Sequence, residues 1–515
     1  MKLMDILLSG TAALALGIGA CAMAQAAAAA MPGPVVARSP MASPRVSAGA
    51  QLPARSVGAP MAEASGAMSE TTLPYAATGP VTTYRTSKEP ARFVVFISGD
   101  GGWNLGVVDM ARQLAHMDAT VVGVDIRHYL RIAQSGRSAT LYPAGDFASL
   151  ALAVQKNLGF QHFHRPVVVG YSSGATLAYG ALAQAPADTF QGAIGLGFCP
   201  DLKTDKPLAA GDGKLAHTTD PTLGFIYGPS RTLTAPFTAL QGGQDGTCLP
   251  AATHAYMAQV PRGRVVDLPK VGHGYAVPAN WAPQFAQAFA SLYAATDGVR
   301  MRTTDTALDA HVADLPLAAL PTAGGGDTLA VFYSGDGGWA GIDQGMSAGF
   351  VRAGIPVVGY DSLRYFWTAR TPQGAAADLT AVLRHYMSAW HKSRIVLTGY
   401  SFGADALPAI IPHLPADLRS HIRGVALVGV DRTGELEFRP GDWLDLSGAS
   451  AYPIAPALAG LKGTPLVCVY GDQESDAACP TFPPGVIRSV RLAGGHHYNG
   501  DFTAVSQAIL KALPQ

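Results

Sequence analysis

The feature that most constrains the fold is a pair of motifs, each of which occurs once in either half of the 515-residue chain. The hexapeptide Ser-Gly-Asp-Gly-Gly-Trp stands at 98–103 and again, unchanged, at 334–339. A Gly-Tyr-Ser-x-Gly pentapeptide follows each copy, at 170–174 and at 399–403. Because both motifs recur at nearly the same separation, the chain contains a tandem duplication. We therefore expect two domains of one fold class.

Each pentapeptide lies between a β-branched apolar run and a segment that favours a helix. In the second half, the run Ile-Val-Leu-Thr at 395–398 comes directly before the motif. Small residues on both sides of the serine permit a sharp strand-to-helix turn, which exposes the serine Oγ in front of the helix N-terminus. This pattern predicts a nucleophile at Ser401, and a second one at Ser172.

Short apolar runs alternate with helical patterns throughout both halves. The first half predicts strands at 93–97, 120–125, 193–198, 237–241 and 265–268, and helices at 147–158 and 283–294. The second half predicts strands at 329–333, 356–360, 425–430, 466–470 and 486–492, and helices at 373–390 and 502–513. Such alternation is typical of a mostly parallel sheet with helices on both faces. The expected fold is two tandem α/β-hydrolase-like domains, at 81–296 and 328–515, joined by a linker at 297–327.

The N-terminal segment differs in character from both domains. Lys2 precedes an apolar run of small residues, and residues 1–25 resemble a secretory signal peptide. Ile-Gly-Ala-Cys21 also fits a lipoprotein cleavage site, and retention of the run as a membrane anchor is a third alternative. Residues 26–80 are rich in Ala, Pro, Ser and Gly, which predicts a disordered tether. We expect a periplasmic protein.

Composition bounds the partners and the cofactors. The chain has 36 Lys and Arg against 36 Asp and Glu and no basic run, so binding to nucleic acid is not expected. No Cys or His spacing indicates a metal site, and no cofactor is expected. Four cysteines follow the N-terminal segment, two in each half. In an exported protein this arrangement predicts the disulfides Cys199–Cys248 and Cys468–Cys479.

A nucleophilic serine needs a histidine to take its proton and a carboxylate to orient that histidine. In an α/β-hydrolase the order along the chain is Ser, acid, His. His496 follows the last predicted strand of the second half, and its Gly-His pair aligns with that of His273 in the first half. His497 is the alternative base.

The acid is expected in the loop after the strand that precedes this last strand. Asp476 is the preferred residue, because Asp476 and Asp245 each precede a cysteine by the same spacing. Asp472 and Glu474 remain alternatives. The first half thus offers a second candidate triad, Ser172, Asp245 and His273.

The hexapeptide follows the strand that supplies the second oxyanion donor in this fold. In the second half the expected donors are the backbone N–H groups of Asp336 or Gly337, together with that of Phe402. Asp100 or Gly101 takes the same place in the first half. The alternative is a tight turn that serves packing only.

Substrate selection is expected in the insert that precedes the acid strand. The second-half insert carries more acids than bases, whereas the charges of the first-half insert balance. We expect a cationic group to be bound there by four acids, Glu435, Glu437, Asp442 and Asp445. The alternative is that these acids form a solvated face.

Four motifs in the second half are similar to those of a known family: Ser-Gly-Asp-Gly-Gly-Trp, Ser-Leu-Arg-Tyr-Phe-Trp at 362–367, Gly-Tyr-Ser-Phe-Gly-Ala-Asp at 399–405 and Gly-His-His-Tyr at 495–498. With them the chain resembles the bacterial virulence protein family of VirJ and AcvB, in its longer AcvB-type form. The resemblance implies a periplasmic serine hydrolase that removes the aminoacyl group from aminoacylated phosphatidylglycerol, notably lysyl-phosphatidylglycerol. It assigns the nucleophile to Ser401, the base to His496 and the acid to Asp476. The first half departs from the family in keeping a complete triad.

Two other readings compete with this one. A general carboxylesterase or lipase would not require a cationic acyl group. A non-catalytic accessory protein of type IV secretion, an association that the resemblance also implies, would keep its function without Ser401. The expected partners are therefore an aminoacylated phospholipid at the membrane surface and proteins of the secretion system.

Overall fold

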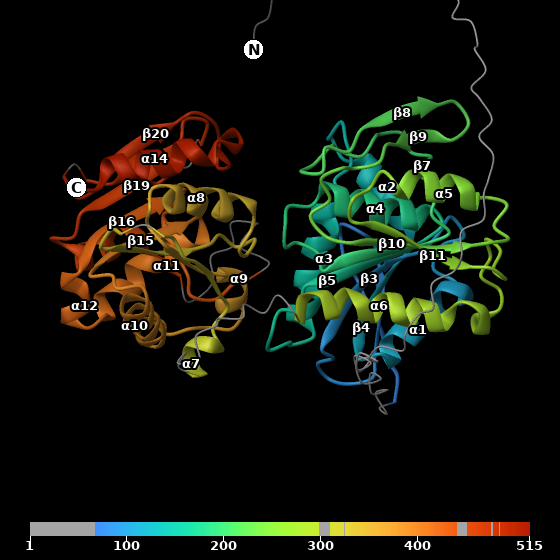
Figure 1. The fold of residues 1–515 in the computed structure, drawn as a ribbon, viewed down its shortest axis with the longest axis horizontal. Coiled ribbons are helices and arrows are strands. Elements are labelled where there is room, and N and C mark those ends of the chain that lie inside the picture. The colour runs from blue at the N-terminus through green and yellow to red at the C-terminus, as the bar shows by residue number, and fades with distance from the viewer. Residues whose placement is uncertain are drawn as a thin grey trace, which may run out of the picture. The chain divides into compact units, whose positions relative to one another are not determined.

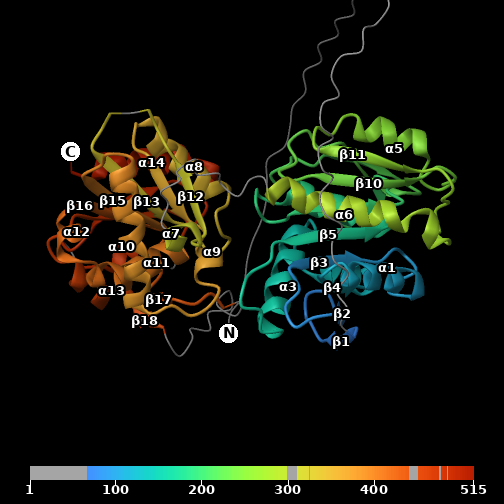
Figure 2. The ribbon, with the colours of Figure 1, turned by 60° about the horizontal axis from the view of Figure 1, so that its bottom comes forward.

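The computed structural model describes residues 67–297, 310–323, 325–439, 451–474, 477–483 and 485–514. Each repeat forms one large sheet with helices on both of its faces (Figures 1 and 2). The prediction of two tandem α/β domains is confirmed. No helix in the described ranges is long and apolar enough to cross a membrane.

The first sheet has eight strands in the order β1-β2-β4-β3-β5-β6-β10-β11. Its strands are β1 (Ser69–Leu73), β2 (Val81–Arg85), β3 (Arg92–Ile97), β4 (Ala119–Val124), β5 (Pro166–Tyr171), β6 (Gly192–Leu196), β10 (Phe237–Gly242) and β11 (Gly263–Leu268). At one edge, β1 pairs antiparallel with β2, and β2 pairs antiparallel with β4. From β4 onward all neighbouring strands are parallel. The surrounding helices are α1 (Leu105–His116), α2 (Ile126–Ser135), α3 (Pro143–Asn157), α4 (Ser173–Gln184), α5 (Pro250–Met257) and α6 (Ala282–Asp297).

The central strand β3 shows why this sheet must be covered on both faces. Phe93 and Val95 belong to one core cluster, which includes residues of α3 and α4, whereas Val94 and Phe96 belong to another, which includes residues of α1 and α6. Side chains alternate between the two faces of a strand, so a strand that is apolar at every position needs two apolar layers. The uninterrupted apolar run seen in the sequence has this cause.

The second sheet has seven strands in the order β12-β14-β13-β15-β16-β19-β20. They are β12 (Leu317–Leu320), β13 (Thr328–Tyr333), β14 (Val357–Tyr360), β15 (Arg394–Tyr400), β16 (Ile422–Val428), β19 (Leu466–Gly471) and β20 (Arg488–Leu492). The main helices are α8 (Gly341–Arg352), α10 (Pro372–Ala389), α11 (Phe402–Ile410) and α14 (Phe502–Ala512). From its antiparallel edge strand onward, the order matches that of the first sheet. This shared strand order is the α/β-hydrolase fold.

Shorter elements lie between these. They are α7 (Ala310–Ala313), α9 (Ser362–Tyr365), α12 (Ala416–Ser420), α13 (Ile454–Ala457), β7 (Asp201–Leu202), β8 (His217–Asp220), β9 (Gly224–Tyr227), β17 (Thr433–Gly434) and β18 (Tyr452–Pro453), with single 3-10 turns at Pro278–Asn280, Ile411–His413, Leu458–Leu461, Cys479–Thr481 and Tyr498–Gly500. Strands β7, β9 and β8 form a small antiparallel sheet in the first insert.

Two edge strands fall where the sequence predicted none. Strand β1 lies inside the segment expected to be a tether, and β12 lies inside the expected linker. Strand β1 is polar and mostly exposed, and β12, although apolar, has only four half-buried residues and no β-branched side chain. Nothing described bears on the expected signal peptide, because residues 1–66 lie outside the described ranges.

Candidate active sites

Ser401 forms the sharp turn between β15 and α11. Its backbone has φ 48° and ψ −122°, a conformation that is costly for a residue with a Cβ atom. The flanking glycines are required by contact: a Cβ on Gly399 would lie 2.4 Å from the carbonyl oxygen of Gly403, and one on Gly403 would lie 2.3 Å from that of Tyr333. The predicted strand, turn and helix are therefore present, and the serine side chain stands at the carboxyl edge of the sheet.

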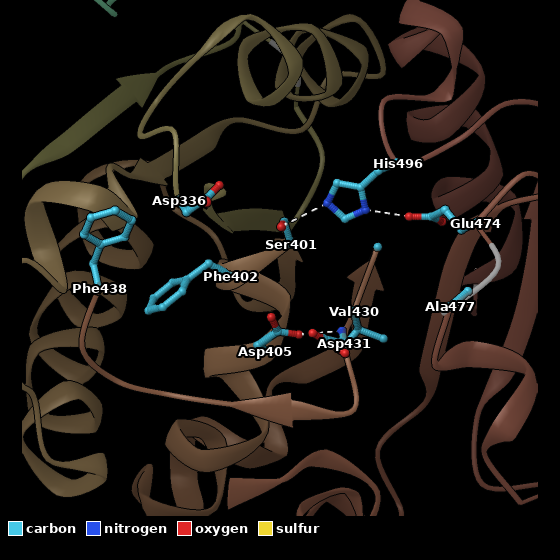
Figure 3. A pocket seen from close by; sticks show the side chains of 11 residues that line it. Asp336, Ser401, Phe402, Asp405, Val430, Asp431, Phe438, Glu474, Ala477 and His496 are labelled. Carbon is cyan, nitrogen blue, oxygen red and sulfur yellow. Dashed lines mark hydrogen bonds and ion pairs between the residues drawn. The ribbon is translucent and has the colours of Figure 1, made fainter. Parts of the chain in front are cut away.

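Two hydrogen bonds connect Ser401 to a histidine and a carboxylate (Figure 3). Ser401 Oγ lies 3.0 Å from His496 Nε2, and His496 Nδ1 lies 2.5 Å from Glu474 Oε1. The second oxygen of Glu474 accepts a hydrogen bond from the Gly471 N–H at 2.6 Å. Burial acts to raise the pKa of Glu474, but the hydrogen bonds from His496 and Gly471 outweigh it and leave the pKa lowered. The carboxylate is thus ionised and can orient the imidazole.

The carboxylate that contacts His496 is therefore Glu474, which was an alternative, and not Asp476, which was the preferred acid. Asp476 lies outside the described residues, and Asp472 accepts a hydrogen bond from the Gly494 N–H at 2.9 Å. The signal was in the sequence. Gly-Asp-Gln-Glu474 aligns with Gly-Gly-Gln-Asp245 when the ends of β19 and β10 are matched, whereas matching the cysteines shifts the alignment because the second loop is longer.

The alternative base, His497, points elsewhere. Its Nδ1 lies 3.3 Å from the hydroxyl of Tyr400, which also donates to the His496 carbonyl oxygen at 3.2 Å. Burial, followed by the neighbouring His496, lowers the pKa of His497. The structure thus brings His496, the preferred base, to the serine.

The hexapeptide forms the same turn in both domains. The Gly338 N–H donates to the Gly335 carbonyl oxygen at 3.1 Å, and the Gly102 N–H donates to that of Gly99 at 2.8 Å. Both donor glycines have positive φ, 77° and 79°. The final tryptophan fits against a glycine of the neighbouring strand, since a Cβ on Gly359 would lie 2.1 Å from the Trp339 ring. The turn therefore has a packing role as well.

The expected oxyanion donors lie beside this turn. Asp336 and Phe402 both line the cavity at Ser401, and Gly337 follows Asp336 in the same loop. Phe402 is the first residue of α11, where backbone N–H groups have no partner within the helix. This N-terminus favours negative charge next to the nucleophile.

The cavity at Ser401 has a volume of about 260 Å³ and an acidic wall (Figure 3). Its lining is Asp336, Ser401, Phe402, Asp405, Gly429, Val430, Asp431, Phe438, Glu474, Ala477 and His496. Four of these residues are acids, and no Lys or Arg occurs among the described residues that line it. Such a wall favours a cationic ligand.

Asp405 and Asp431 form a pair within this wall. The Asp431 N–H donates to Asp405 Oδ1 at 2.8 Å, and the Tyr452 hydroxyl donates to the Asp405 carbonyl oxygen. Burial raises the pKa of Asp405 well above its ordinary value; the Asp431 N–H opposes this rise, and the carboxylates of Asp431 and Asp336 add to it. Asp405 lies in the first turn of α11, directly after the elbow, and lines the same cavity as Ser401.

Of the acids expected to bind substrate, Glu435 and Glu437 are described, and neither is among the residues that line this cavity. Glu437 Oε2 lies 2.9 Å from Arg439 Nη2, and Glu435 is within 3.9 Å of the same guanidinium group. Asp442 and Asp445 lie outside the described residues. Sequence reasoning missed Asp405 and Asp431 as wall residues, although Asp405 stands inside the elbow motif itself.

The first domain brings together its own triad. Ser172 Oγ lies 3.0 Å from His273 Nε2, and His273 Nδ1 lies 2.9 Å from Asp245 Oδ2. Ser172 has φ 55° and ψ −124°, nearly the values of Ser401. Of the expected oxyanion residues, Asp100 accepts a hydrogen bond from Ser173 Oγ at 2.7 Å, and Gly101 follows it in the hexapeptide turn.

Both predicted disulfides are present. Cys468–Cys479 joins strand β19 to the loop behind Glu474, and Cys199–Cys248 joins the loop after β6 to the loop that carries Asp245. Asp245, Cys248 and His273 are close enough to hold a metal ion. Cys248, however, has no free thiol, and the other two residues bond to each other.

Removing the second disulfide should destabilise the second domain. A bridge that closes a loop of 11 residues is worth about 2–3 kcal/mol in the chain-entropy account. We expect the double replacement Cys468→Ala and Cys479→Ala to lower the free energy of unfolding by this amount, measured by chemical denaturation of the oxidised protein. An unchanged denaturation midpoint, or two alkylatable thiols in the unreduced native protein, would contradict the prediction.

The strand order, the two elbows and the order of Ser, acid and His define both domains as members of the α/β-hydrolase fold class. The family model described as bacterial virulence protein (VirJ) matches residues 91–195 and 327–515, more than half of the chain. The protein belongs to this family. In the first domain the match ends before the acid and the histidine.

Comparison with curated proteins gives no match. Among solved structures, the chain is similar to a Klebsiella pneumoniae protein assigned as a dienelactone hydrolase, with 14% identity, a TM-score of 0.33, and coverage of 44% of this chain and 99% of the other. An esterase domain of a Rhodothermus marinus protein shows 13% identity and a TM-score of 0.30, and the match covers 44% of this chain and 97% of the other. XC6422 from Xanthomonas campestris, described as a serine hydrolase without lid, shows 18% identity and a TM-score of 0.28. This match covers 43% of this chain and 94% of the other.

Proposed function

We propose that the Ser401 site is a serine hydrolase site that cleaves the aminoacyl ester of aminoacylated phosphatidylglycerol, with lysyl-phosphatidylglycerol as the representative substrate. One observation carries the proposal: a Ser-His-Glu hydrogen-bond chain opens into a cavity whose described lining contains four acids and no Lys or Arg. The ester class is supported by membership of the family. It is also supported by the substrate that the resemblance of the sequence motifs implies.

The reaction follows from the geometry. His496 Nε2 takes the proton of Ser401 Oγ as the oxygen attacks the acyl carbonyl carbon. The developing oxyanion faces the Phe402 N–H and the hexapeptide loop. The C–O bond to the glycerol breaks, and His496 returns the proton to the leaving oxygen. Water then attacks the aminoacyl-serine by the same steps in reverse, which releases the free amino acid.

The acidic wall supplies the selectivity. An aminoacyl ester has its α-ammonium group one carbon away from the carbonyl, and a lysyl group adds a second ammonium at the end of its side chain. A carboxylate such as Asp405 or Asp431 can accept hydrogen bonds from such a group. An uncharged acyl group would leave these acids desolvated and unpaired, which costs free energy.

The proposed location is the periplasm. It is supported by two disulfides, which persist in oxidising compartments, and by the signal-like N-terminal sequence. There the substrate would be presented at the outer face of the inner membrane. Association with type IV secretion proteins is proposed from the family resemblance alone.

Asp405 offers a direct test of this selectivity. We expect Asp405→Asn to lower the ratio of kcat/KM for lysyl-phosphatidylglycerol to that for its N-acetylated form about ten- to a hundredfold, the worth of a hydrogen bond to a charged group. The matching amide replacement Glu437→Gln tests whether the acidic insert before β19 binds the cationic group instead. A larger fall with Glu437→Gln would return selectivity to the insert, and equal rates on both lipids in the wild type would favour a general esterase.

The raised pKa of Asp405 adds a signature in pH. The carboxyl group is neutral below its raised pKa and charged above it, so the preference for the cationic ester should increase as pH rises through that pKa. In Asp405→Asn the preference should be independent of pH over this range. A wild-type preference that falls as pH rises would contradict the role of Asp405.

The same variant should be more stable at neutral pH. A carboxyl group whose pKa is raised by folding contributes its stability below its unfolded pKa and loses it as pH rises through the folded pKa. An amide in place of the carboxyl group avoids this loss and should raise Tm by about 2–4 °C, which corresponds to about 1 kcal/mol in a domain of this size. A more stable variant with lower selectivity cannot be explained by misfolding.

A further inference from the structure

The first domain contains the parts of a complete serine hydrolase site. Asp245 is only 3% exposed, and its Oδ1 accepts hydrogen bonds from the Thr247 and Cys248 N–H groups at 2.9 and 2.8 Å. Its other oxygen faces His273, which reaches Ser172. A buried carboxylate and a serine at positive φ are both costly features, and packing alone requires neither.

The residues around the two triads correspond position by position along the sequence. Gly197 and Gly429 both have positive φ, and a Cβ on either would lie close to Cε1 of the triad histidine, at 3.1 and 2.8 Å. Counting from these glycines, the position of Asp431 is held by Cys199. Counting from the serines, the position of Asp405 is held by Thr176.

Both exchanges remove negative charge from the first site. Thr176 Oγ1 donates to the Cys199 carbonyl oxygen at 2.7 Å, and Cys199 is in a disulfide. The contact between Asp405 and Asp431 is thus replaced by a neutral contact at the same place. Asp201, in β7, keeps negative charge near Asp100: burial raises its pKa, its own backbone N–H opposes this rise, and the charges of Asp100 and Asp220 add to it.

Apolar side chains accompany the first triad instead. Leu249 follows Cys248 in the acid loop and is 58% exposed, and Val277 in the loop after His273 is 54% exposed. They lie on the two loops that carry the acid and the base.

From the intact triad and the loss of the acidic pair, we propose that the first domain is a second, independent ester hydrolase, and that it takes uncharged acyl groups. Ser172 Oγ attacks the acyl carbonyl carbon and passes its proton to His273 Nε2. The ester C–O bond breaks, and the leaving alcohol receives that proton. Water then releases the carboxylic acid from the acyl-serine. The chain thus carries two hydrolase sites of different charge selectivity.

The test uses the full chain with Ser401→Ala, so that only the first site can react. A fluorophosphonate probe followed by peptide mapping should label Ser172. This variant should hydrolyse para-nitrophenyl butyrate faster than the lysyl para-nitrophenyl ester. Adding Ser172→Ala should lower the butyrate rate about a thousandfold or more, as expected for the loss of a nucleophile. The outcome does not depend on whether Ser401 accepts lysyl lipids.

A charge exchange tests the selectivity. In the Ser401→Ala background, Thr176→Asp should raise the ratio of the lysyl to the butyrate rate about tenfold, whereas the matched neutral variant Thr176→Asn should not. Three results would each overturn the proposal: an unlabelled Ser172 in the folded variant, a butyrate rate no higher than that of the double variant, or a preference for the lysyl ester without Thr176→Asp.

Discussion

Replacing Ser401 with alanine is expected to lower kcat for lysyl-phosphatidylglycerol by about a millionfold, because a triad without its nucleophile retains only binding and oxyanion stabilisation. The measurement is release of free lysine from the lipid in vesicles. It should be made in a Ser172→Ala background, so that the first domain does not contribute. No other single replacement in the second domain should have a larger effect.

The control for this variant is its folding. The Oγ of Ser401 contacts His496, but the elbow is fixed by its glycines and by the strand order, so the variant should unfold at nearly the parent temperature. A folded variant with activity within tenfold of its parent would exclude Ser401 as the nucleophile. It would also favour the alternative of a non-catalytic accessory protein.

The inner architecture of both domains could be predicted because it follows from local patterns. After its first residue, a strand such as β3 or β13 is hydrophobic at every position since both of its faces are covered, and this leaves an unmistakable run in the sequence. Edge strand β1 escaped prediction because it is polar and mostly exposed, and β12 because it is a four-residue Leu-Ala-Ala-Leu run without β-branched side chains. The duplication fixed the count of domains independently of any secondary structure.

The nucleophile and the base of the candidate site were predictable, whereas the acid and the cavity wall depend on loop conformation. Ser401 and His496 stand in glycine-rich motifs at strand ends, so the sequence was sufficient for both. Asp476 was preferred to Glu474 because the cysteines of the two halves were matched, and the longer loop before Cys479 shifts that alignment by two residues. Asp431 reaches the cavity only because β16 lies beside β15, and sheet order is not readable from a single strand.

The acid can be identified by a pair of matched amide replacements, again in the Ser172→Ala background. Glu474→Gln is expected to lower kcat about ten-thousandfold, since a neutral amide can donate to His496 Nδ1 and select the wrong tautomer. Because the pKa of Glu474 is lowered, its carboxylate stays ionised at neutral and mildly acidic pH, so titration of Glu474 should not limit activity there. Asp476→Asn, two residues along the chain, should cost less than about tenfold, because His496 Nδ1 already has Glu474 as its partner. If Asp476→Asn instead gave the larger loss in a folded protein, the acid would be Asp476, and Glu474 would serve only to hold the Gly471 N–H.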